Sequence, residues 1–190
     1  MTPLERALRT AARFLEAEGI PYMVIGGVAN LVWGLARTTL DVDITVWVEE
    51  ARIPPVVERA AGSFRVLPED PLAFVQTTRV LPLETKEGFR VDLIFGQLPY
   101  EERAVRRAVV HEPAGLGIRV CTAEDLIVHK IISDRLQDRE DIRGIVQRRG
   151  PQLDRAYLDP LIEGLARDLA RPDILAFYRA CLGPQEEPRR

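Results

Sequence analysis

Two acidic residues alternate with branched apolar residues between Asp41 and Val46, and this alternation constrains the fold more than any other feature. Successive side chains of a β-strand point to opposite faces of the sheet, so Asp41 and Asp43 share one face while the apolar residues pack on the other. On such a strand the two residues lie roughly 6.5 Å apart, so their oxygens can share divalent ions that lie about 3.5–4 Å from each other. The pattern therefore predicts a metal-binding strand.

A third acidic residue, Asp92, lies in another apolar stretch, at residues 89–95. Residues 74–84 are predicted to be extended, and the turn at 86–88 joins them to the Asp92 stretch as a hairpin. A small set of hard oxygen ligands suits Mg²⁺, which keeps several waters and takes further ligands from substrate phosphates. We therefore predict that Asp41, Asp43 and Asp92 hold two Mg²⁺ ions if the two strands are neighbours.

A glycine pair, Gly26 and Gly27, separates the apolar segment 22–25 from a helix predicted to begin at Val28. Glycines permit a tight turn and a close approach of the backbone, so amide groups at the helix N-terminus can face a phosphate. We expect this pair to bring backbone amide groups up to a phosphate. Considered alone, such a pair is most often a simple turn, and paired aspartates often cap a helix, so the inference depends on their order and spacing.

These segments, taken in this order, resemble the nucleotidyltransferase superfamily of polymerase-β-like enzymes. The run from Ala123 to Ile142 is similar to the helical motif of the AbiEii-type branch, known as toxins of toxin–antitoxin and abortive-infection systems. The resemblance covers about residues 20–145. It implies an α+β fold, in which a mixed β-sheet flanked by helices is followed by a C-terminal helical lobe. Many relatives carry Ser after the first glycine, whereas Gly27 here leaves phosphate binding to the backbone.

Lys130 is predicted to bind the triphosphate from the helical lobe. Only one other lysine, Lys86, occurs among the basic residues, which suggests that a compact point charge is needed at Lys130. On a continuous helix, Lys130, Asp134 and Asp141 fall within about 40° of one another, so we expect one polar stripe and assign Asp141 to the nucleotide site. The alternative is an ordinary ion pair between Lys130 and Asp134.

Two residues that lead into the acidic strand, Arg37 and Thr39, are also assigned to the nucleotide site. Arg37 has two interpretations, contact with a substrate phosphate or pairing with a carboxylate, and the sequence leaves both open.

The length of 190 residues allows one core and a smaller appended lobe. We expect a nucleotidyltransferase core at 1–120, a helical lobe at 121–182 and a flexible tail at 183–190. Two scattered cysteines and an ordinary globular composition indicate a cytoplasmic protein without membrane association. The formal net charge of −3 argues against a protein that coats nucleic acid, although a local basic patch is compatible with it.

The resemblance implies Mg²⁺-dependent transfer of a nucleoside monophosphate from an NTP to an acceptor hydroxyl, with Asp41, Asp43 and Asp92 as catalytic residues. The AbiEii-type branch implies a tRNA 3′ end or another cellular target as the acceptor, and a cognate antitoxin as a partner. Antibiotic nucleotidyltransferases share the same core and would use a small aminoglycoside-like alcohol. A catalytically inactive protein that binds a nucleotide or a partner is the third hypothesis, and the sequence leaves all three open.

Overall fold

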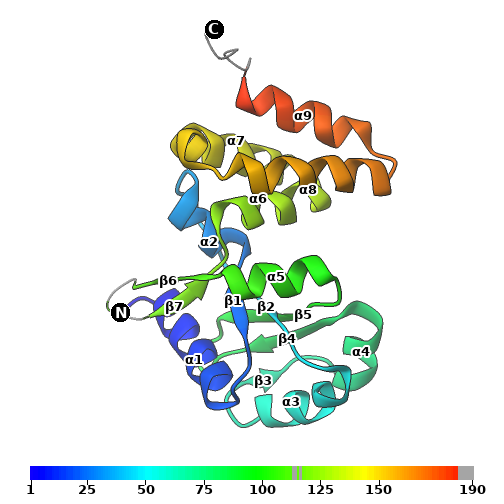
Figure 1. Ribbon diagram of the computed structural model, residues 1–190. Coiled ribbons are helices and arrows are strands. Elements are labelled where there is room, and N and C mark those ends of the chain that lie inside the picture. Colours follow the sequence, from blue (N-terminus) through cyan, green and yellow to red (C-terminus); the bar gives the residue numbers. More distant parts are fainter. Residues whose placement is uncertain (113–114, 116, 184–190) are drawn as a thin grey trace, which may run out of the picture. The chain divides into compact units, whose positions relative to one another are not determined.

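The structure, a computed structural model, describes residues 1–112, 115 and 117–183. The chain divides into two compact units, which are described separately (Figure 1). Unit 1 comprises residues 1–29 and 37–122, and unit 2 comprises residues 30–36 and the chain from residue 123 onward. Residues 30–36, which lie inside the predicted core of 1–120, thus group with unit 2. The predicted tail at 183–190 lies outside the described residues except for Gly183.

Unit 1 alternates strands with helices. Its elements are α1 (Pro3–Ala17), β1 (Tyr22–Val24), the first half of α2 (Gly26–Trp33), β2 (Asp41–Val46), the 3-10 helix η1 (Glu50–Arg52), α3 (Ile53–Ala60), β3 (Arg65–Val66), α4 (Pro71–Thr78), β4 (Val80–Glu84), β5 (Arg90–Phe95), α5 (Pro99–Arg107), β6 (Val109–His111) and β7 (Ile118–Val120). Unit 2 is helical. Its elements are the second half of α2, α6 (Ala123–Ser133), α7 (Leu136–Arg149), the 3-10 helix η3 (Gly150–Gln152), α8 (Arg155–Asp168) and α9 (Pro172–Leu182).

The strands of unit 1 form one mixed sheet with the order β3-β4-β5-β2-β1-β7-β6. The pairs β2–β5 and β1–β7 are parallel, and the remaining pairs are antiparallel. The predicted α+β class with a mixed sheet and a helical segment after it is therefore confirmed. The predicted hairpin is confirmed as well, because β4 and β5 pair antiparallel across the turn that contains Gly88.

The two faces of the central strands differ in burial. One face carries apolar side chains that are at most 1% exposed: Val42, Ile44, Val46, Leu81, Leu83, Val91, Leu93 and Phe95. Each fully buried side chain of this kind contributes about 1.5–3 kcal/mol relative to an exposed one. The opposite face carries the alternate residues of β2 and β5, including Asp41, Asp43 and Asp92, which are half-buried. In Figure 1, α5 lies on one side of the sheet and α1 and α3 lie on the other.

Capping and an apolar stripe explain why the N-terminal helix α1 forms. Thr2 caps the helix, Pro3 occupies its first turn, and the Glu5 carboxylate accepts a hydrogen bond from the Thr2 amide, which completes a capping box. The helix buries an apolar stripe that includes Leu8 and Leu15, and it contacts β2, β5 and β7. This packing supports the sheet below the two strands that carry the acidic residues.

The prediction that residues 74–84 are extended is wrong for the first half of that segment. Residues up to Thr78 form α4, and only the second half forms β4. Asp70 and Pro71, which resemble a turn in the sequence, instead begin the helix, because Asp70 Oδ1 accepts a hydrogen bond from the Ala73 amide at 3.0 Å. Arg79, with φ of 60°, ends the helix and returns the chain to β4.

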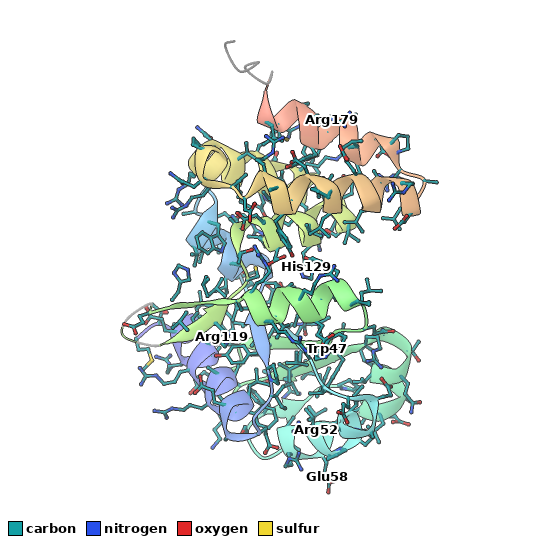
Figure 2. All side chains as sticks on the ribbon, viewed as in Figure 1. Trp47, Arg52, Glu58, Arg119, His129 and Arg179 are labelled. Atoms are coloured by element: carbon teal, nitrogen blue, oxygen red, sulfur yellow. The ribbon has the colours of Figure 1, made fainter. Side chains whose placement is uncertain are left out.

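Side chains also connect elements at the β6–β7 end of the sheet, where Figure 2 labels Arg119. Arg119, on β7, donates a hydrogen bond from Nη2 to the carbonyl oxygen of Ala108, at 3.2 Å, and so connects β7 to the end of α5. Gly96, just after β5, allows another close approach, because a Cβ there would lie 3.0 Å from Cε3 of Trp47.

Unit 2 is helical, in agreement with the helical character predicted for residues 121–182. The helices α6 and α7 are separated at Asp134, whose φ of 49° is incompatible with a continuous α-helix. Among the described residues, no helix combines the length and the apolar character that crossing a bilayer requires.

Candidate active site

The parallel pairing of β2 and β5 brings the predicted acidic residues to one face of the sheet. Asp43 aligns with Asp92, and Asp41 aligns with Arg90. Aligned residues on neighbouring strands point to the same face, and the strands are about 4.8 Å apart. The condition set by the sequence analysis, that the Asp92 strand is a neighbour of the acidic strand, is therefore met. The catalytic and metal-binding roles of the three aspartates stay predictions.

Arg90 belongs to this cluster, although it is absent from the residues that the sequence predicts for the site. Its Nε donates to both carboxylate oxygens of Asp92, at 3.0 and 3.1 Å. The hydrogen bond to Asp92, and then the charges of Asp92, Asp41 and Asp43, raise the pKa of the guanidinium. Three carboxylates therefore act on one cation. The signal in the sequence is its position two residues before Asp92, which places both on the same face of the strand.

Gly26 places the N-terminus of α2 against Asp43. The helix begins at Gly26, two residues earlier than predicted, and Gly26 has a φ of +63°, which favours glycine. A Cβ at this position would collide with the carboxylate of Asp43 and would lie 2.9 Å from its Cγ. The backbone of Ile25 also donates to the Asp43 carbonyl, at 2.9 Å. The first amide groups of α2, which have no acceptor within the helix, thus begin beside an acidic residue.

Gly27 packs against Thr39, and Thr39 holds Asp41. A Cβ at Gly27 would lie 2.7 Å from Cβ of Thr39. The hydroxyl of Thr39 is 3.1 Å from Asp41 Oδ1 and 3.2 Å from the Asp41 carbonyl oxygen, and it donates to both. Thr39 therefore orients a carboxylate, and its predicted contact with a nucleotide stays a prediction. Arg37 donates from Nη1 to the Thr38 carbonyl at 3.2 Å, and its two predicted roles remain untested.

The chemistry of these residues fits Mg²⁺. Asp41, Asp43 and Asp92 offer hard carboxylate oxygens from two neighbouring strands, on the half-exposed face of the sheet. One positive charge already lies here: the guanidinium of Arg90 contacts Asp92, and the charges of Asp41 and Asp43 also raise its pKa. Asp92 is directed to Arg90 in this conformation, and across the described residues no three acidic, histidine or cysteine side chains are gathered as a ligand set. Asp92 would have to share its oxygens between Arg90 and an ion.

The remaining predicted residues, Lys130 and Asp141, lie in unit 2 and contact each other. Lys130 is 4% exposed, and its Nζ donates to Asp141 Oδ2 at 2.6 Å and to Asp138 Oδ1 at 3.1 Å. The predicted proximity of Lys130 and Asp141 is confirmed, but it arises from α7 folding back onto α6, not from one continuous helix. The role of these two residues in nucleotide binding stays a prediction.

The predicted stripe is wrong with respect to Asp134, and so is the alternative pair of Lys130 with Asp134. The carboxylate of Asp134 accepts hydrogen bonds from Arg139, at 2.5 and 2.9 Å, and from Arg171, at 2.6 Å. The residue that replaces it beside Lys130 is Asp138, which the sequence did not indicate. Its position eight residues after Lys130 indicates a contact only if the break between α6 and α7 is known, because on a continuous helix the two side chains would lie about two turns apart.

Asp138 remains ionised in spite of its burial. Burial raises the pKa of this carboxyl, but hydrogen bonds from Arg135, Ser133 and Lys130 outweigh burial and lower the pKa to about 2. The distances are 2.7 Å from Arg135 Nε and 2.5 Å from the Ser133 hydroxyl. The network therefore holds two buried carboxylates around one buried lysine, with Arg135 at the surface.

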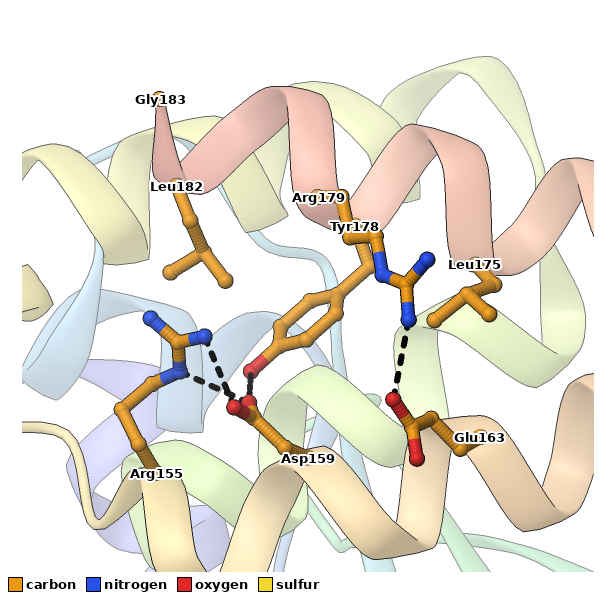
Figure 3. A pocket seen from close by; sticks show the side chains of 8 residues that line it. All are labelled: Arg155, Asp159, Glu163, Leu175, Tyr178, Arg179, Leu182 and Gly183. Atoms are coloured by element: carbon orange, nitrogen blue, oxygen red, sulfur yellow. Dashed lines mark hydrogen bonds and ion pairs between the residues drawn. The ribbon is translucent and has the colours of Figure 1, made fainter. Parts of the chain in front are cut away.

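A cavity of about 310 Å³ lies between α8 and α9, in unit 2 (Figure 3). Its charged groups are paired with one another: Arg155 donates twice to Asp159, both at 2.7 Å, and the Tyr178 hydroxyl donates to Asp159 at 2.5 Å. Burial and the bond to Asp159 raise the pKa of Tyr178. Arg179 bonds to Glu163 at 3.0 Å across the cavity. The Tyr178–Asp159 and Arg179–Glu163 bonds connect the two helices, and the two ion pairs leave the lining of the cavity with no net charge.

No model of a known protein family matches the sequence, and a search of curated proteins found no significant match. Solved structures do match. A nucleotidyltransferase-like protein from Paracoccidioides brasiliensis is 18% identical, with a TM-score of 0.56, over 92% of this chain and 91% of that one. The chain has a nucleotidyltransferase-like fold. The antibiotic-resistance factor ANT(2″)-Ia shares it at 14% identity, with a TM-score of 0.58, over 94% of this chain and 100% of that chain.

A third structure with this nucleotidyltransferase-like fold is the lincosamide antibiotic adenylyltransferase LnuA in its lincomycin-bound form. It is 14% identical, with a TM-score of 0.52, over 74% of this chain and 95% of that one. At identities this low the likeness establishes the fold, and the chemistry must be argued from the residues of this chain.

Proposed function

We propose that this protein transfers a nucleoside monophosphate from an NTP to an acceptor hydroxyl and releases pyrophosphate. The observation that carries the proposal is the alignment of Asp43 with Asp92, with Asp41 on the same face and the glycine turn of α2 against Asp43. Transfer of a phosphoryl group needs acidic oxygens that bind metal ions and backbone amides that bind phosphates. Here the carboxylates and the N-terminus of α2 offer both at one place. The nucleotidyltransferase-like fold supports the same reaction class.

Each residue would have a distinct part in the reaction. Asp41 and Asp43 would hold two Mg²⁺ ions, and Asp92 would complete the ligands on the side of the attacking hydroxyl. Bound Mg²⁺ would lower the pKa of that hydroxyl and would neutralise negative charge on the leaving pyrophosphate. The acceptor oxygen forms a bond to the α-phosphorus, the bond from the α-phosphorus to the bridging oxygen breaks, and Asp92 accepts the hydroxyl proton.

Other residues would position these groups. Gly26 and Gly27 would place the first amide groups of α2 toward the triphosphate, and Thr39 would keep the Asp41 carboxylate oriented. Lys130 and Asp141 are part of the proposal through the resemblance to the AbiEii-type branch. The buried pairing of Lys130 with two carboxylates means that its charge is already compensated within unit 2.

The acceptor is proposed to be a small alcohol. Of the proteins that share the fold, LnuA is an antibiotic adenylyltransferase by name and ANT(2″)-Ia an antibiotic-resistance factor, and one structure of ANT(2″)-Ia contains adenylyl-2″-tobramycin. The predicted alternatives, a tRNA 3′ end with a cognate antitoxin and a catalytically inactive binding protein, are carried as outcomes of the experiment below. The location, which the sequence predicts to be cytoplasmic, stays part of the proposal.

The test is an incubation of the purified protein with α-labelled NTPs and Mg²⁺, in parallel with total tRNA and with tobramycin or lincomycin. The variant Asp43→Asn keeps the shape of the side chain and removes its charge, and Glu87→Gln removes a charge from an exposed turn as the control. We expect transfer to a small alcohol that Asp43→Asn abolishes and Glu87→Gln leaves unchanged.

A readout independent of activity is the binding of Mn²⁺, which favours the same oxygen ligands as Mg²⁺. We expect Asp43→Asn to weaken Mn²⁺ binding to the free protein. Labelled tRNA in place of labelled alcohol would support the toxin interpretation. No transfer to any acceptor, together with no Mn²⁺ or nucleotide binding, would contradict the enzyme hypothesis and favour the inactive binding protein.

A further inference from the structure

Unit 1 contains an open cavity of about 560 Å³ between α4 and the β4–β5 hairpin. Its walls are partly apolar, from Leu67, Phe74 and Pro82, and partly charged, from Glu69, Asp70 and Arg90. The volume lies within the usual range of about 300–1,000 Å³ for sites that bind small molecules. Phe74 is 40% exposed. Exposure of an aromatic ring to water forgoes the favourable free energy of burying its apolar surface.

The sheet register places this cavity beside the acidic cluster. Pro82, which lines the cavity, is the β4 partner of Asp92 in the antiparallel β4–β5 pair. Arg90, which also lines it, donates to Asp92 and aligns with Asp41. The cavity and the carboxylates therefore share one face of the sheet, and Arg90 belongs to both.

The polar groups of the cavity are available to a ligand. Arg90 directs only Nε to Asp92, and its two Nη groups donate no hydrogen bond to the described residues. A guanidinium has five N–H donors, so four remain. Among the other lining residues, Asp70 accepts a hydrogen bond from the Ala73 amide, and Glu69 is exposed. The cavity thus offers an apolar wall, hydrogen-bond donors near Asp92 and negative charge at its rim.

We propose that this cavity is the acceptor subsite of the enzyme and that it takes a small amphipathic amino alcohol, an inference that rests on the proposed function. The apolar body of the acceptor packs on Phe74 and Pro82, and its ammonium group faces Glu69 and Asp70. Its reacting hydroxyl is directed to Asp92, and a second oxygen accepts a hydrogen bond from Arg90. The hydroxyl oxygen then bonds to the α-phosphorus, pyrophosphate leaves, and the hydroxyl proton passes to Asp92.

The charge at the rim favours this ligand over an RNA 3′ end. A polynucleotide would carry its phosphates past Glu69 and Asp70, where like charges repel. An ammonium group gains from the same carboxylates, and an apolar ring gains from Phe74. A neutral alcohol of the same shape would keep the apolar contact and lose the electrostatic one.

Binding to the full-length protein, without nucleotide or metal, tests the subsite directly. The probes are 2-amino-1-phenylethanol, its neutral analogue 1-phenylethane-1,2-diol and a short single-stranded RNA with a free 3′-hydroxyl, each titrated by NMR into ¹⁵N-labelled protein. The variants are Phe74→Ala and Glu69→Gln. Leu72→Ala is the control for Phe74→Ala, because Leu72 is 39% exposed on the same helix and does not line the cavity. Glu87→Gln is the control for Glu69→Gln.

We expect the amine to bind more tightly than the diol and to shift the resonances of residues around Phe74. Phe74→Ala should weaken both ligands about tenfold, the equivalent of about 1.4 kcal/mol. Glu69→Gln should weaken only the amine, by about two- to fivefold as for an exposed ion pair, and so remove most of its preference over the diol. The two controls should bind both ligands as the unmodified protein does.

Several results would overturn the subsite. The first is that the amine does not bind up to millimolar concentration. The second is that its affinity is unchanged in both Phe74→Ala and Glu69→Gln. The third is that the RNA binds more tightly than the amine and loses this binding in Phe74→Ala. Transfer that depends on Asp43 but not on Phe74 or Glu69 would overturn the subsite and leave the proposed function standing. Cavity binding without transfer to any acceptor would overturn the acceptor role together with the proposed function.

Discussion

Replacement of Gly26 by alanine tests the glycine turn against Asp43. Two costs follow from the structure. The φ of +63° is unfavourable for alanine by about 1–2 kcal/mol. The new Cβ would lie 2.9 Å from Asp43 Cγ, so the side chain or the strand has to move, which in a packed site costs typically about 1–3 kcal/mol. We therefore expect Gly26→Ala to lower the free energy of unfolding by about 2–5 kcal/mol.

Gly88 provides the matched control for the backbone cost. It has a φ of +78°, and a Cβ added there meets no atom within 4 Å. Gly88→Ala should therefore cost about 1–2 kcal/mol only. Alanine also restricts the unfolded chain, but this effect is similar in both variants and cancels in their difference. The difference between the two variants isolates the displacement of Asp43.

Urea unfolding followed by circular dichroism measures the two free energies, and a Mn²⁺ titration of the folded protein measures the state of the acidic cluster. Gly26→Ala should lose both stability and Mn²⁺ affinity, whereas Gly88→Ala should lose stability alone. The reasoning is refuted if Gly26→Ala is no less stable than Gly88→Ala and binds Mn²⁺ as the unmodified protein does. That outcome would mean that Asp43 does not depend on the glycine turn.

Two further predictions concern the buried network of unit 2. Lys130→Met removes the buried positive charge that pairs with both Asp138 and Asp141, although Asp138 keeps its ion pair with Arg135, and should cost about 3–5 kcal/mol in urea unfolding. Lys86→Met, in an exposed turn, should stay within about 0.5 kcal/mol, and equal effects would contradict the network. The pKa of Asp138, about 2 when folded and 3.8 ordinarily, gives stability that is present above about pH 4 and lost as the pH falls toward 2. This loss amounts to about 2 kcal/mol. Between about pH 4 and about pH 2 the free energy of unfolding should therefore fall less steeply with pH in Asp138→Asn than in the unmodified protein. Equal slopes in the two proteins would contradict the lowered pKa of Asp138.

The acidic strands could be predicted because their signal is local. Asp41 and Asp43 alternate with buried residues, and the same alternation surrounds Asp92. The turn before β5 contains Gly88 with a positive φ, so the hairpin was visible in the sequence as well. The pairing of β5 with β2 depends on contacts between residues far apart in the sequence, and the structure provides it in the register that aligns Asp43 with Asp92.

The errors fall where the local signal is weak. Helix α4 buries only Val75, so it lacks the apolar spacing by which an amphipathic helix is recognised. Asp70 and Pro71 begin a helix and a turn equally well, and only the hydrogen bond to Ala73 decides between them. No glycine or proline marks the break at Asp134, whose positive φ is uncommon for residues other than glycine. Hydrogen bonds from Arg139 and Arg171 hold its carboxylate there, and these contacts are not visible in the local sequence.

The stability of the sheet and the assembly of the candidate site have one physical cause. A shift of β5 by one residue against its neighbours would turn Arg90 and Asp92 toward the core and expose Val91, which is fully buried. The cost of burying charged groups excludes that register, so the apolar face selects the alignment that also places Asp92 beside Asp43. Arg90 arrives on the same strand and offsets the repulsion among three carboxylates. The cluster can therefore form when the sheet folds, before any ion or nucleotide binds.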